Sequence, residues 1–443
     1  MTAAVVPQID FERLKAAVRQ APDWHAIGLV KRVVGLTIEA TGPCVSIGDT
    51  CFVEVGGGEQ VATEVVGFRD DRILMMPLGE LTGIAPGAKV TSLAKPLSVP
   101  VGPELVGRVL NSLGEPIDGK GPLKCQATRP VHGRPPTPLD RQMIDTPLSV
   151  GVRAIDSLIT CGKGQRVAIM AGSGVGKSSL LGMMARYTSA EINCIALIGE
   201  RGREVREFIE RDLGPEGLAR SIVIVATSDE PALLRIRGAM VATTLAEYFR
   251  DQGCDVLLLM DSLTRFAMAQ REIGLAIGEP PTTRGYTPSV FSLLPKLLER
   301  AGPGEKGAVT GFYTVLVDGD DFTEPIADAV RSIVDGHIVL SRQLGERNHY
   351  PAIDVLASVS RVMSGIVDDK HRRAAGLLRD ALATYRDAED LVNVGAYKRG
   401  ANARIDQALD AIDAVNAFLR QERDEGCTFE AAYRALLDLF PVD

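Results

Sequence analysis

Three patterns of hydrophobic and polar residues follow one another along the chain. Between Ala26 and about Ala94, short β-type runs are separated by Gly, Asp or Pro, and this spacing predicts a small β-barrel; the runs include LVKRVVGLTIEA, CFVEV, VATEVVGF, RILMMPL and KVTSLA. From about Gly151 to Arg342, wholly apolar runs alternate with amphipathic segments, as in VAIMAG, CIALIGE, SIVIVATS, DVLLLMDS, GFYTVLV and HIVLS. This alternation predicts a parallel sheet with helices on both faces. After about Ile366 the chain is rich in Ala, Leu, Arg and Asp, which predicts a helical C-terminal domain.

These patterns divide the 443 residues into four predicted parts, because the length exceeds that of one hydrophobic core. They are an N-terminal amphipathic segment (1–24), a β-barrel domain (25–95), a central α/β domain (96–345) and a helical domain (346–443). A Pro-rich stretch between Arg129 and Pro147 predicts an extended arm that leads into the central domain. The N-terminal segment is expected to form a short amphipathic helix from residues near helical spacing: Ile9, Phe11, Leu14 and Val18.

The composition is that of a globular protein, with 45% apolar and 24% charged residues. No apolar run approaches the roughly 18 residues that span a bilayer, and the N-terminus lacks the pattern of a secretory signal. The seven cysteines are scattered and never spaced as C-x-x-C, so we expect free thiols in a reducing cytoplasm. The net charge of −8 argues against a broad nucleic-acid-binding surface.

The stretch AGSGVGKSS, from Ala171 to Ser179, lies between an apolar strand-like run and a helix-like one. Glycines here allow successive backbone N–H groups to turn toward one anion at a helix N-terminus, so this context predicts a phosphate-binding loop. The strict pattern has Gly at the first position, where this chain has Ala171. Lys177 adds a charge at the β- and γ-phosphates. The predicted nucleotide-binding residues are Gly172, Ser173, Gly174, Val175, Gly176, Lys177, Ser178 and Ser179.

A magnesium site is predicted from Ser178 and Asp261. The Ser178 hydroxyl follows the lysine of the loop and is the expected Mg²⁺ ligand. Asp261 ends the apolar run DVLLLMD, and a carboxylate at that edge of a parallel sheet faces the ligand crevice. Asp261 is therefore the expected partner of the metal, directly or through water. It can at the same time cap the helix that follows.

Glu200 is the candidate catalytic carboxylate. It ends the run CIALIGE and opens GERGREVREFIERDL, so it is expected beside the bound phosphate. A carboxylate in that place can orient and polarise the water that attacks the γ-phosphate, which contributes roughly 10²–10⁴-fold to the rate. An isolated Glu at a loop would instead be an ordinary solvated residue; its position after a buried strand favours the catalytic role.

Several longer strings resemble one protein family. AGSGVGKSSLL, GERGREV, DSLTRFAMAQREIGLAIGEPPTTRGYTPSVFSLLPKLLERAG, YTVLVDGDDFTEPIAD, DGHIVLSR and HYPAIDVLASVSRVM are similar to the catalytic subunits of rotary ATPases. More closely they resemble the ATPases of type III protein export, either flagellar or of the virulence injectisome. The resemblance covers roughly residues 25–443. It implies an α/β fold with a RecA-like P-loop ATPase core between an N-terminal β-barrel and a C-terminal helical domain, with Mg²⁺ as cofactor and ATP as substrate.

The resemblance also implies roles for individual residues. It makes Glu200 the catalytic glutamate and suggests that Arg201 holds its surroundings. It places Tyr350 of HYPAID on the adenine ring, where an aromatic side chain offers stacking area. It makes Arg361 of SVSRV the arginine that reaches the neighbouring subunit's nucleotide, although the sequence alone equally allows a structural ion pair. The catalytic set is thus Lys177, Glu200, Arg201, Asp261 and Arg361.

One chain that carries Lys177, Glu200, Tyr350 and Arg361 together implies a homohexamer with six competent sites. By the same resemblance, the partners expected are the stalk and regulator proteins of the export apparatus, chaperones and export substrates. The protein is expected in the cytoplasm, peripheral to the inner-membrane export apparatus and attached to it through those partners. The N-terminal segment has few basic residues, so a protein is its expected partner and not the membrane itself.

Two other functions compete with protein export. A hexameric RNA translocase of the transcription-terminator type shares the core but needs exposed aromatic and basic residues in its N-terminal domain, and Phe52 and Phe68 are the only aromatic residues between 26 and 94. A regulatory subunit without hydrolysis would be expected to lack Lys177 or Glu200, and both are present. No nucleic-acid partner is therefore expected. The motifs do not separate the flagellar from the injectisome system, and we favour flagellar export.

Overall fold

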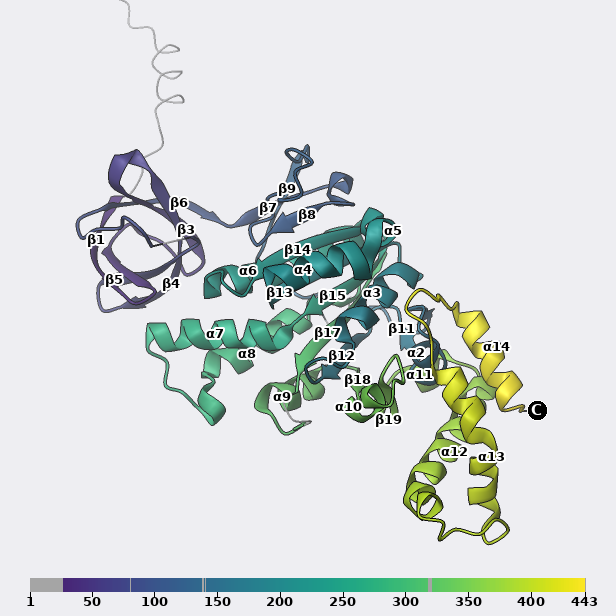
Figure 1. Cartoon of the computed structure of the whole chain (residues 1–443). Helices are drawn as coiled ribbons and strands as arrows, with labels where there is room; N and C mark the ends of the chain where they lie inside the picture. The colour runs from purple at the N-terminus through teal and green to yellow at the C-terminus, as the bar shows by residue number, and fades with distance from the viewer. Residues whose placement is uncertain (1–26, 80, 138, 140, 318–320, 443) are drawn as a thin grey trace, which may run out of the picture. The chain divides into compact units, whose positions relative to one another are not determined.

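The backbone of the computed structural model divides after Lys95 into two compact units, and each is described by itself (Figure 1). The structure describes residues 27–442 except 80, 138, 140 and 318–320. The expected N-terminal helix at 1–24 lies outside the described residues.

The first unit is a closed six-stranded β-barrel with the strand order β1-β2-β5-β4-β3-β6. The single run LVKRVVGLTIEA becomes two strands because Gly35 turns the chain at φ 57°. Small and medium apolar side chains fill the interior, among them Val30, Ile38, Val65 and Met75. The strands are β1 Ile27–Val34, β2 Thr37–Thr41, β3 Asp49–Glu54, β4 Gln60–Arg69, β5 Arg72–Pro77 and β6 Lys89–Pro96.

The second unit is built on a nine-stranded sheet with the order β19-β18-β12-β17-β15-β13-β14-β8, to which β16 adds beside β17. All six apolar runs of the central domain form parallel strands, as expected. The strands are β8 Val109–Asn111, β12 Arg166–Ala171, β13 Ile192–Glu200, β14 Ser221–Thr227, β15 Asp255–Asp261, β16 Gly302–Pro303, β17 Ala308–Leu316, β18 Gly336–Leu340 and β19 Ile353–Ser360.

The sheet is not purely parallel, which corrects the sequence-based expectation. Strand β19 pairs antiparallel with β18 and extends the sheet to Ser360, beyond residue 345. Its side chains alternate between buried and more exposed positions, as in an edge strand, so it shows no continuous apolar run. Two short paired segments lie beside the sheet: β7 Ser98–Val101 with β9 Ala127–Pro130, and β10 Pro147–Leu148 with β11 Cys161–Gly162.

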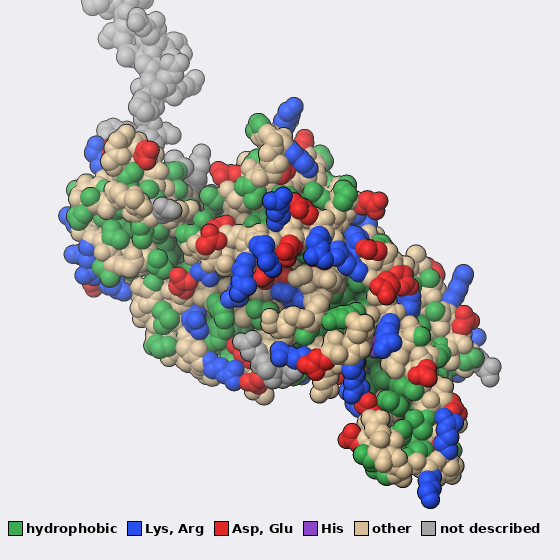
Figure 2. Space-filling view, in the orientation of Figure 1, with side chains coloured by type: hydrophobic (Ala, Val, Ile, Leu, Met, Phe, Trp, Pro, Cys, Tyr) green, Lys and Arg blue, Asp and Glu red, His purple; other side chains and the backbone are tan. Residues whose placement is uncertain are grey.

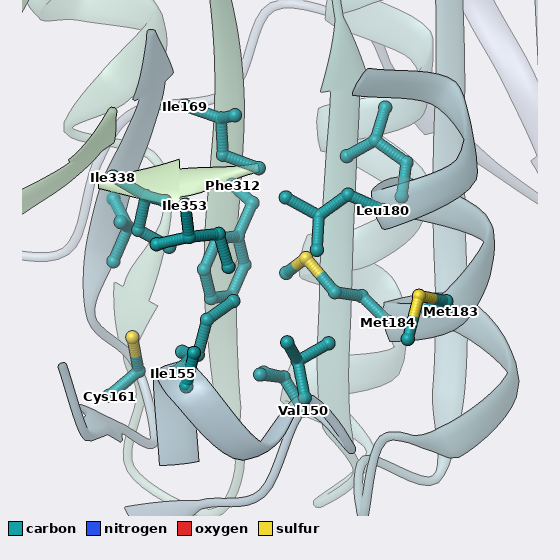
Figure 3. Close-up of a cluster of buried hydrophobic side chains, with 14 of the residues drawn as sticks. Val150, Ile155, Cys161, Ile169, Leu180, Met183, Met184, Phe312, Ile338 and Ile353 are labelled. Atoms are coloured by element: carbon teal, nitrogen blue, oxygen red, sulfur yellow. The ribbon is translucent and has the colours of Figure 1, made fainter. Parts of the chain in front are cut away.

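Helices cover the sheet on both faces. The helix that follows the phosphate loop, α3 Lys177–Tyr187, packs Leu180 and Met184 against the strand residues Ile169 and Phe312 (Figure 3). Helix α6 Ala232–Asp251 lies on β13, β14 and β15. The remaining helices of this part are α2 Arg153–Leu158, α4 Gly202–Glu207, the π-helix η3 Phe208–Leu213, α5 Gly214–Ala219, α7 Leu263–Ile277, α8 Pro288–Leu298, α9 Pro325–Ile333, α10 Arg342–Glu346, α11 Met363–Ile366 and the short 3-10 helices η2 Pro103–Leu105 and η4 Thr283–Gly285.

The C-terminal helices share their core with the sheet. Leu378, Val415, Phe418 and Leu436 belong to the same buried cluster as Ile169. The helices are α12 Asp369–Asn393, α13 Ala403–Leu419 and α14 Phe429–Leu439, the first two forming a long hairpin (Figure 1). The segment between α13 and α14 is therefore held against the sheet domain, where it contributes to the site described below.

A glycine in α3 shows how closely the phosphate-loop helix is packed. A Cβ on Gly182 would lie 2.6 Å from the backbone oxygen of Asp212 in η3, whereas a Cβ on Gly376 in α12 would meet no atom within 4 Å. Alanine is otherwise favoured over glycine in a helix by about 0.5–1 kcal/mol. We therefore expect Gly182→Ala to lower the free energy of unfolding by about 1–3 kcal/mol through overpacking, and Gly376→Ala to leave it unchanged or raise it. Chemical denaturation measures both; equal effects of the two substitutions would contradict this packing.

Candidate functional site

The phosphate loop joins the end of β12 to the start of α3. Gly174 and Gly176 adopt φ values of 77° and 90°, a region that side-chain-bearing residues rarely enter. Gly172 does not need a positive φ, contrary to the expectation that all three glycines serve this purpose. Val175 is buried and anchors the loop, while Ser173 and Gly174 are exposed. The loop thus presents its backbone to solvent at a helix N-terminus, as an anion site requires.

Lys177 lies between two carboxylates that come from two other strands. Its Nζ is 2.5 Å from Oδ1 of Asp261 and 3.3 Å from Oε1 of Glu200. Asp261 ends β15 and Glu200 ends β13, and these strands are neighbours in the parallel sheet. The carboxyl ends of parallel strands meet at one edge, so the fold itself gathers the three groups beside the phosphate loop. This confirms that the three residues lie together; their catalytic roles remain predictions.

Burial and charge set the protonation of this cluster. Burial disfavours the Lys177 ammonium, but Asp261 and Glu200 outweigh it and raise the pKa of Lys177. Burial, assisted by the negative charge of Asp261, raises the pKa of Glu200 to about 7, although Lys177 opposes the shift. Glu200 is therefore poised near neutral pH, where a general base is most effective.

The residues at this edge fit a magnesium ion held together with a phosphate. Asp261 is only 3% exposed, and the ammonium of Lys177 already shows that a positive charge is accommodated at its carboxylate. Ser178 offers an exposed hydroxyl in the first turn of α3. Hydroxyl and carboxylate oxygens are ligands that Mg²⁺ accepts. Among the described residues no group of three or more His, Cys, Asp or Glu side chains forms a metal site by itself, so the phosphates and water would supply the other ligands.

A cavity of about 440 Å³ adjoins the loop and has room for a nucleotide base. The ring of Tyr350 forms one wall and lies 3.4 Å from where a Cβ on Gly176 would be. Another part of the lining was not foreseen from the sequence: it comes from the segment between α13 and α14, with Arg420, Gln421, Glu422, Arg423 and Glu425.

Gln421 fixes this lining to the rest of the unit. Its Nε2 donates to the carbonyl oxygen of Gly151 at 2.8 Å, and its Oε1 accepts from the backbone N of Arg153 at 2.7 Å. Its own backbone N donates to the carbonyl oxygen of Tyr350 at 3.0 Å. Gln421 therefore links the segment after α13 both to Tyr350 and to the backbone at Gly151 and Arg153.

Arg201 does not reach the Lys177 cluster. Its side chain is 81% exposed, and its guanidinium lies 3.4 Å from Glu204 one turn along α4. Its backbone provides the N-cap position of that helix. The predicted role of Arg201 around Glu200 stays a prediction.

Arg361 lies at the amino ends of the parallel strands, whereas the phosphate loop lies at their carboxyl ends. The β18–β19 register sets Ser360 beside Gly336 at the start of β18, whereas Leu340 at the end of β18 pairs with Ala171 before the loop. The six residues of β12 between those ends span roughly 20 Å. Arg361 is exposed and donates to the carbonyl oxygen of Arg331 at 3.1 Å. It does not serve the phosphate loop of its own chain in this arrangement.

Sequence reasoning missed two polar residues near the cluster. The hydroxyl of Thr314 donates to Oδ1 of Asp261 at 2.7 Å. Arg265 on α7 packs against Gly199, where an added Cβ would lie 2.7 Å from its Cβ, and its Nε is buried with no hydrogen-bond partner among the described residues. A polar residue within the apolar run GFYTVLV was the available signal for Thr314. The run LTRFAMA gave no such signal for Arg265, because arginine is common on helix surfaces.

Comparison with known proteins places the chain in a family. Three family descriptions match consecutive parts: the ATP synthase alpha/beta family β-barrel domain at residues 30–94, the nucleotide-binding domain of the same family at 151–360, and the C-terminal domain of the type III secretion ATPase EscN at 367–438. No helix among the described residues is long and apolar enough to cross a membrane.

Individual relatives agree with this assignment. The flagellum-specific ATP synthase of Bacillus subtilis is 54% identical over 424 residues, which are 95% of this chain and 97% of the relative. The type 3 secretion system ATPase of Xanthomonas euvesicatoria is 54% identical over 404 residues, 91% of each chain. The structure of assembled EscN from enteropathogenic E. coli in complex with its central stalk EscO superimposes with a TM-score of 0.86 at 44% identity, over 93% of this chain and 99% of that one. The chain therefore belongs to the family of flagellar and type III secretion ATPases, and it is an ATPase.

Proposed function

We propose that this protein is a Mg²⁺-dependent, homohexameric ATPase that energises flagellar protein export. The ATPase activity and the type III export family come from the relatives; the magnesium ion, the hexamer and the flagellar system are our proposal. The relatives include flagellar and type 3 secretion ATPases at equal identity, so the flagellar assignment rests on the resemblance of the stretch DSLTRFAMAQREIGLAIGEPPTTRGY. The injectisome is the alternative system. The protein would act at the inner membrane through stalk, regulator and chaperone proteins.

The observation that carries the mechanism is the position of Lys177 between Asp261 and Glu200. A phosphate in the loop competes with the two carboxylates for the ammonium, so binding of ATP releases them. Asp261, with Ser178, would then hold Mg²⁺, which neutralises charge on the β- and γ-phosphate oxygens. Glu200, freed from Lys177, accepts a proton from the attacking water. Tyr350 and the 420–425 segment would hold the base.

The raised pKa of Glu200 predicts the pH dependence of hydrolysis. The base works only when deprotonated, so kcat/KM at constant free Mg²⁺ should fall about tenfold per unit as the pH drops below about 7. Glu200→Gln should bind Mg-ATP as the parent does, hydrolyse it at least ~10²-fold more slowly and lose this acidic limb. Steady-state assays from pH 5 to 9 test both statements. A limb near the ordinary glutamate value, or one that persists in Glu200→Gln, would remove Glu200 from the proton transfer.

The hexamer is supported by the place of Arg361. Since Arg361 lies across the sheet from its own phosphate loop and is exposed, a second chain is the way for it to reach a nucleotide. A planar, permanently charged guanidinium suits the spread negative charge of phosphoryl transfer. The solved structure of EscN with its central stalk is that of an assembled ATPase, which accords with this arrangement.

Mixing two inactive variants tests the shared site. Arg361→Ala should bind ATP but hydrolyse it on the order of 10³-fold more slowly, and Lys177→Ala should be inactive because its loop lacks the ammonium. Mixed together, they should regain activity at interfaces that join an intact loop to an intact arginine. Arg399→Ala, an exposed arginine on the α12–α13 hairpin, is the matched control and should keep parental hydrolysis. No recovery on mixing, with turnover independent of protein concentration, would contradict the trans role.

The system served is tested in cells of the source organism. A strain without this protein should fail to export flagellin and swim, and the parental chain should restore both, whereas Lys177→Ala should restore neither despite equal expression. Loss of injectisome secretion with normal motility would assign the protein to the alternative system.

The remaining alternative, an RNA translocase, predicts that single-stranded RNA stimulates hydrolysis. RNA binding depends on basic side chains that neutralise the phosphates. Because basic and acidic side chains are interspersed on the face seen in Figure 2, we expect RNA not to stimulate ATP hydrolysis.

A further inference from the structure

Thr314 is a polar residue in the middle of a buried apolar strand. It is fully buried in β17, between β12 and β15, and its neighbours along the strand are Tyr313 and Val315. Its hydroxyl lies 2.7 Å from Oδ1 of Asp261 and 3.4 Å from the carbonyl oxygen of Met260. One hydroxyl carries one proton, so the shorter contact with the charged acceptor is the one it makes.

Two donors therefore meet at the same oxygen of Asp261. Lys177 and Thr314 both bind Oδ1, at 2.5 Å and 2.7 Å, and neither engages Oδ2. The two donors differ in freedom. Lys177 has a long side chain that must leave Asp261 to reach a phosphate, whereas Thr314 is β-branched and enclosed in the sheet.

From this difference we infer that Thr314 is a positioning residue: its hydroxyl holds Oδ1 of Asp261 while Lys177 transfers to the nucleotide, so that the carboxylate keeps its orientation and stays available to the metal. This inference rests on the proposed role of Asp261 at Mg²⁺. Without Thr314, Lys177 is the one donor to Oδ1 that remains among the described residues. The carboxylate then stays paired with the ammonium or turns away, and the metal has to compete for it.

A structural role alone would give a different result. A buried threonine also satisfies its own hydroxyl and fills space, and its loss can lower stability without touching the metal. Valine has nearly the same shape, so Thr314→Val removes the donor with little change in packing. Thr310 supplies a control on the same strand, because it is equally buried but accepts from the backbone N of Gly164 at the other end of β17.

The test is titration calorimetry of the full-length protein with ADP, with and without Mg²⁺. We expect Thr314→Val to reduce the Mg²⁺-dependent gain in ADP affinity by roughly tenfold, the effect of one hydrogen bond to a charged group, while affinity without Mg²⁺ stays parental. The Mg²⁺ concentration for half-maximal hydrolysis should rise by a similar factor. Thr314→Ser, which keeps the hydroxyl, should restore both values, and Thr310→Val should change neither, whatever its stability.

Asp261→Asn separates this inference from the function on which it rests. If that variant loses the Mg²⁺-dependent gain but Thr314→Val keeps it in full, the positioning role of Thr314 is wrong and the metal role of Asp261 stands. If Asp261→Asn itself keeps the gain, the proposed role of Asp261 at the metal is overturned, and the inference with it. A loss in Thr314→Val that Thr314→Ser does not restore would also contradict the role of the hydroxyl.

Discussion

The pairing of one lysine with two carboxylates is the interaction on which the site depends. Lys177, Asp261 and Glu200 are all largely buried. The ammonium of Lys177 compensates one carboxylate, and burial with the charge of Asp261 raises the pKa of Glu200 to about 7. The cluster exists only because a parallel sheet brings its strand ends to one edge. The ion pairs that stabilise the cluster also prepare its chemistry. A phosphate that binds the ammonium of Lys177 leaves two carboxylates without their partner, one suited to binding a metal and one to accepting a proton.

The rest of the second unit keeps that edge in place and completes it. The buried core runs from the sheet through α3 into the C-terminal helices, so the segment after α13 lines the same cavity as Tyr350. Gly182, packed on the backbone of η3, ties the phosphate-loop helix to the helices after Glu200. By contrast, Arg361 lies at the other end of the same strands, away from the phosphate loop of its own chain.

The sequence predicted most of the architecture because its signals are local. Continuous apolar runs gave six strands of the sheet, and the glycine-rich loop with Lys177 gave the phosphate site; Asp261 and Glu200 followed from their places at strand ends. Three features were not predicted from the sequence, because they depend on contacts between residues that are far apart along the chain. Strand β19 has the mixed pattern of an edge strand. The cavity lining at 420–425 lies far along the chain from the phosphate loop, and Thr314 meets Asp261 only because β17 and β15 are neighbours in the sheet.

We propose that Lys177 exchanges its carboxylates for phosphate in a site completed by a second chain. A structure of the assembled protein with Mg²⁺, ADP and aluminium fluoride, a mimic of phosphoryl transfer, tests it most directly. We expect Lys177 Nζ on the fluoride or phosphate oxygens, Asp261 at the metal or its water, Glu200 beside the attacking water, and Arg361 arriving from the neighbouring subunit. Lys177 still bonded to Asp261 with nucleotide in place, or Arg361 remote from every nucleotide, would contradict it.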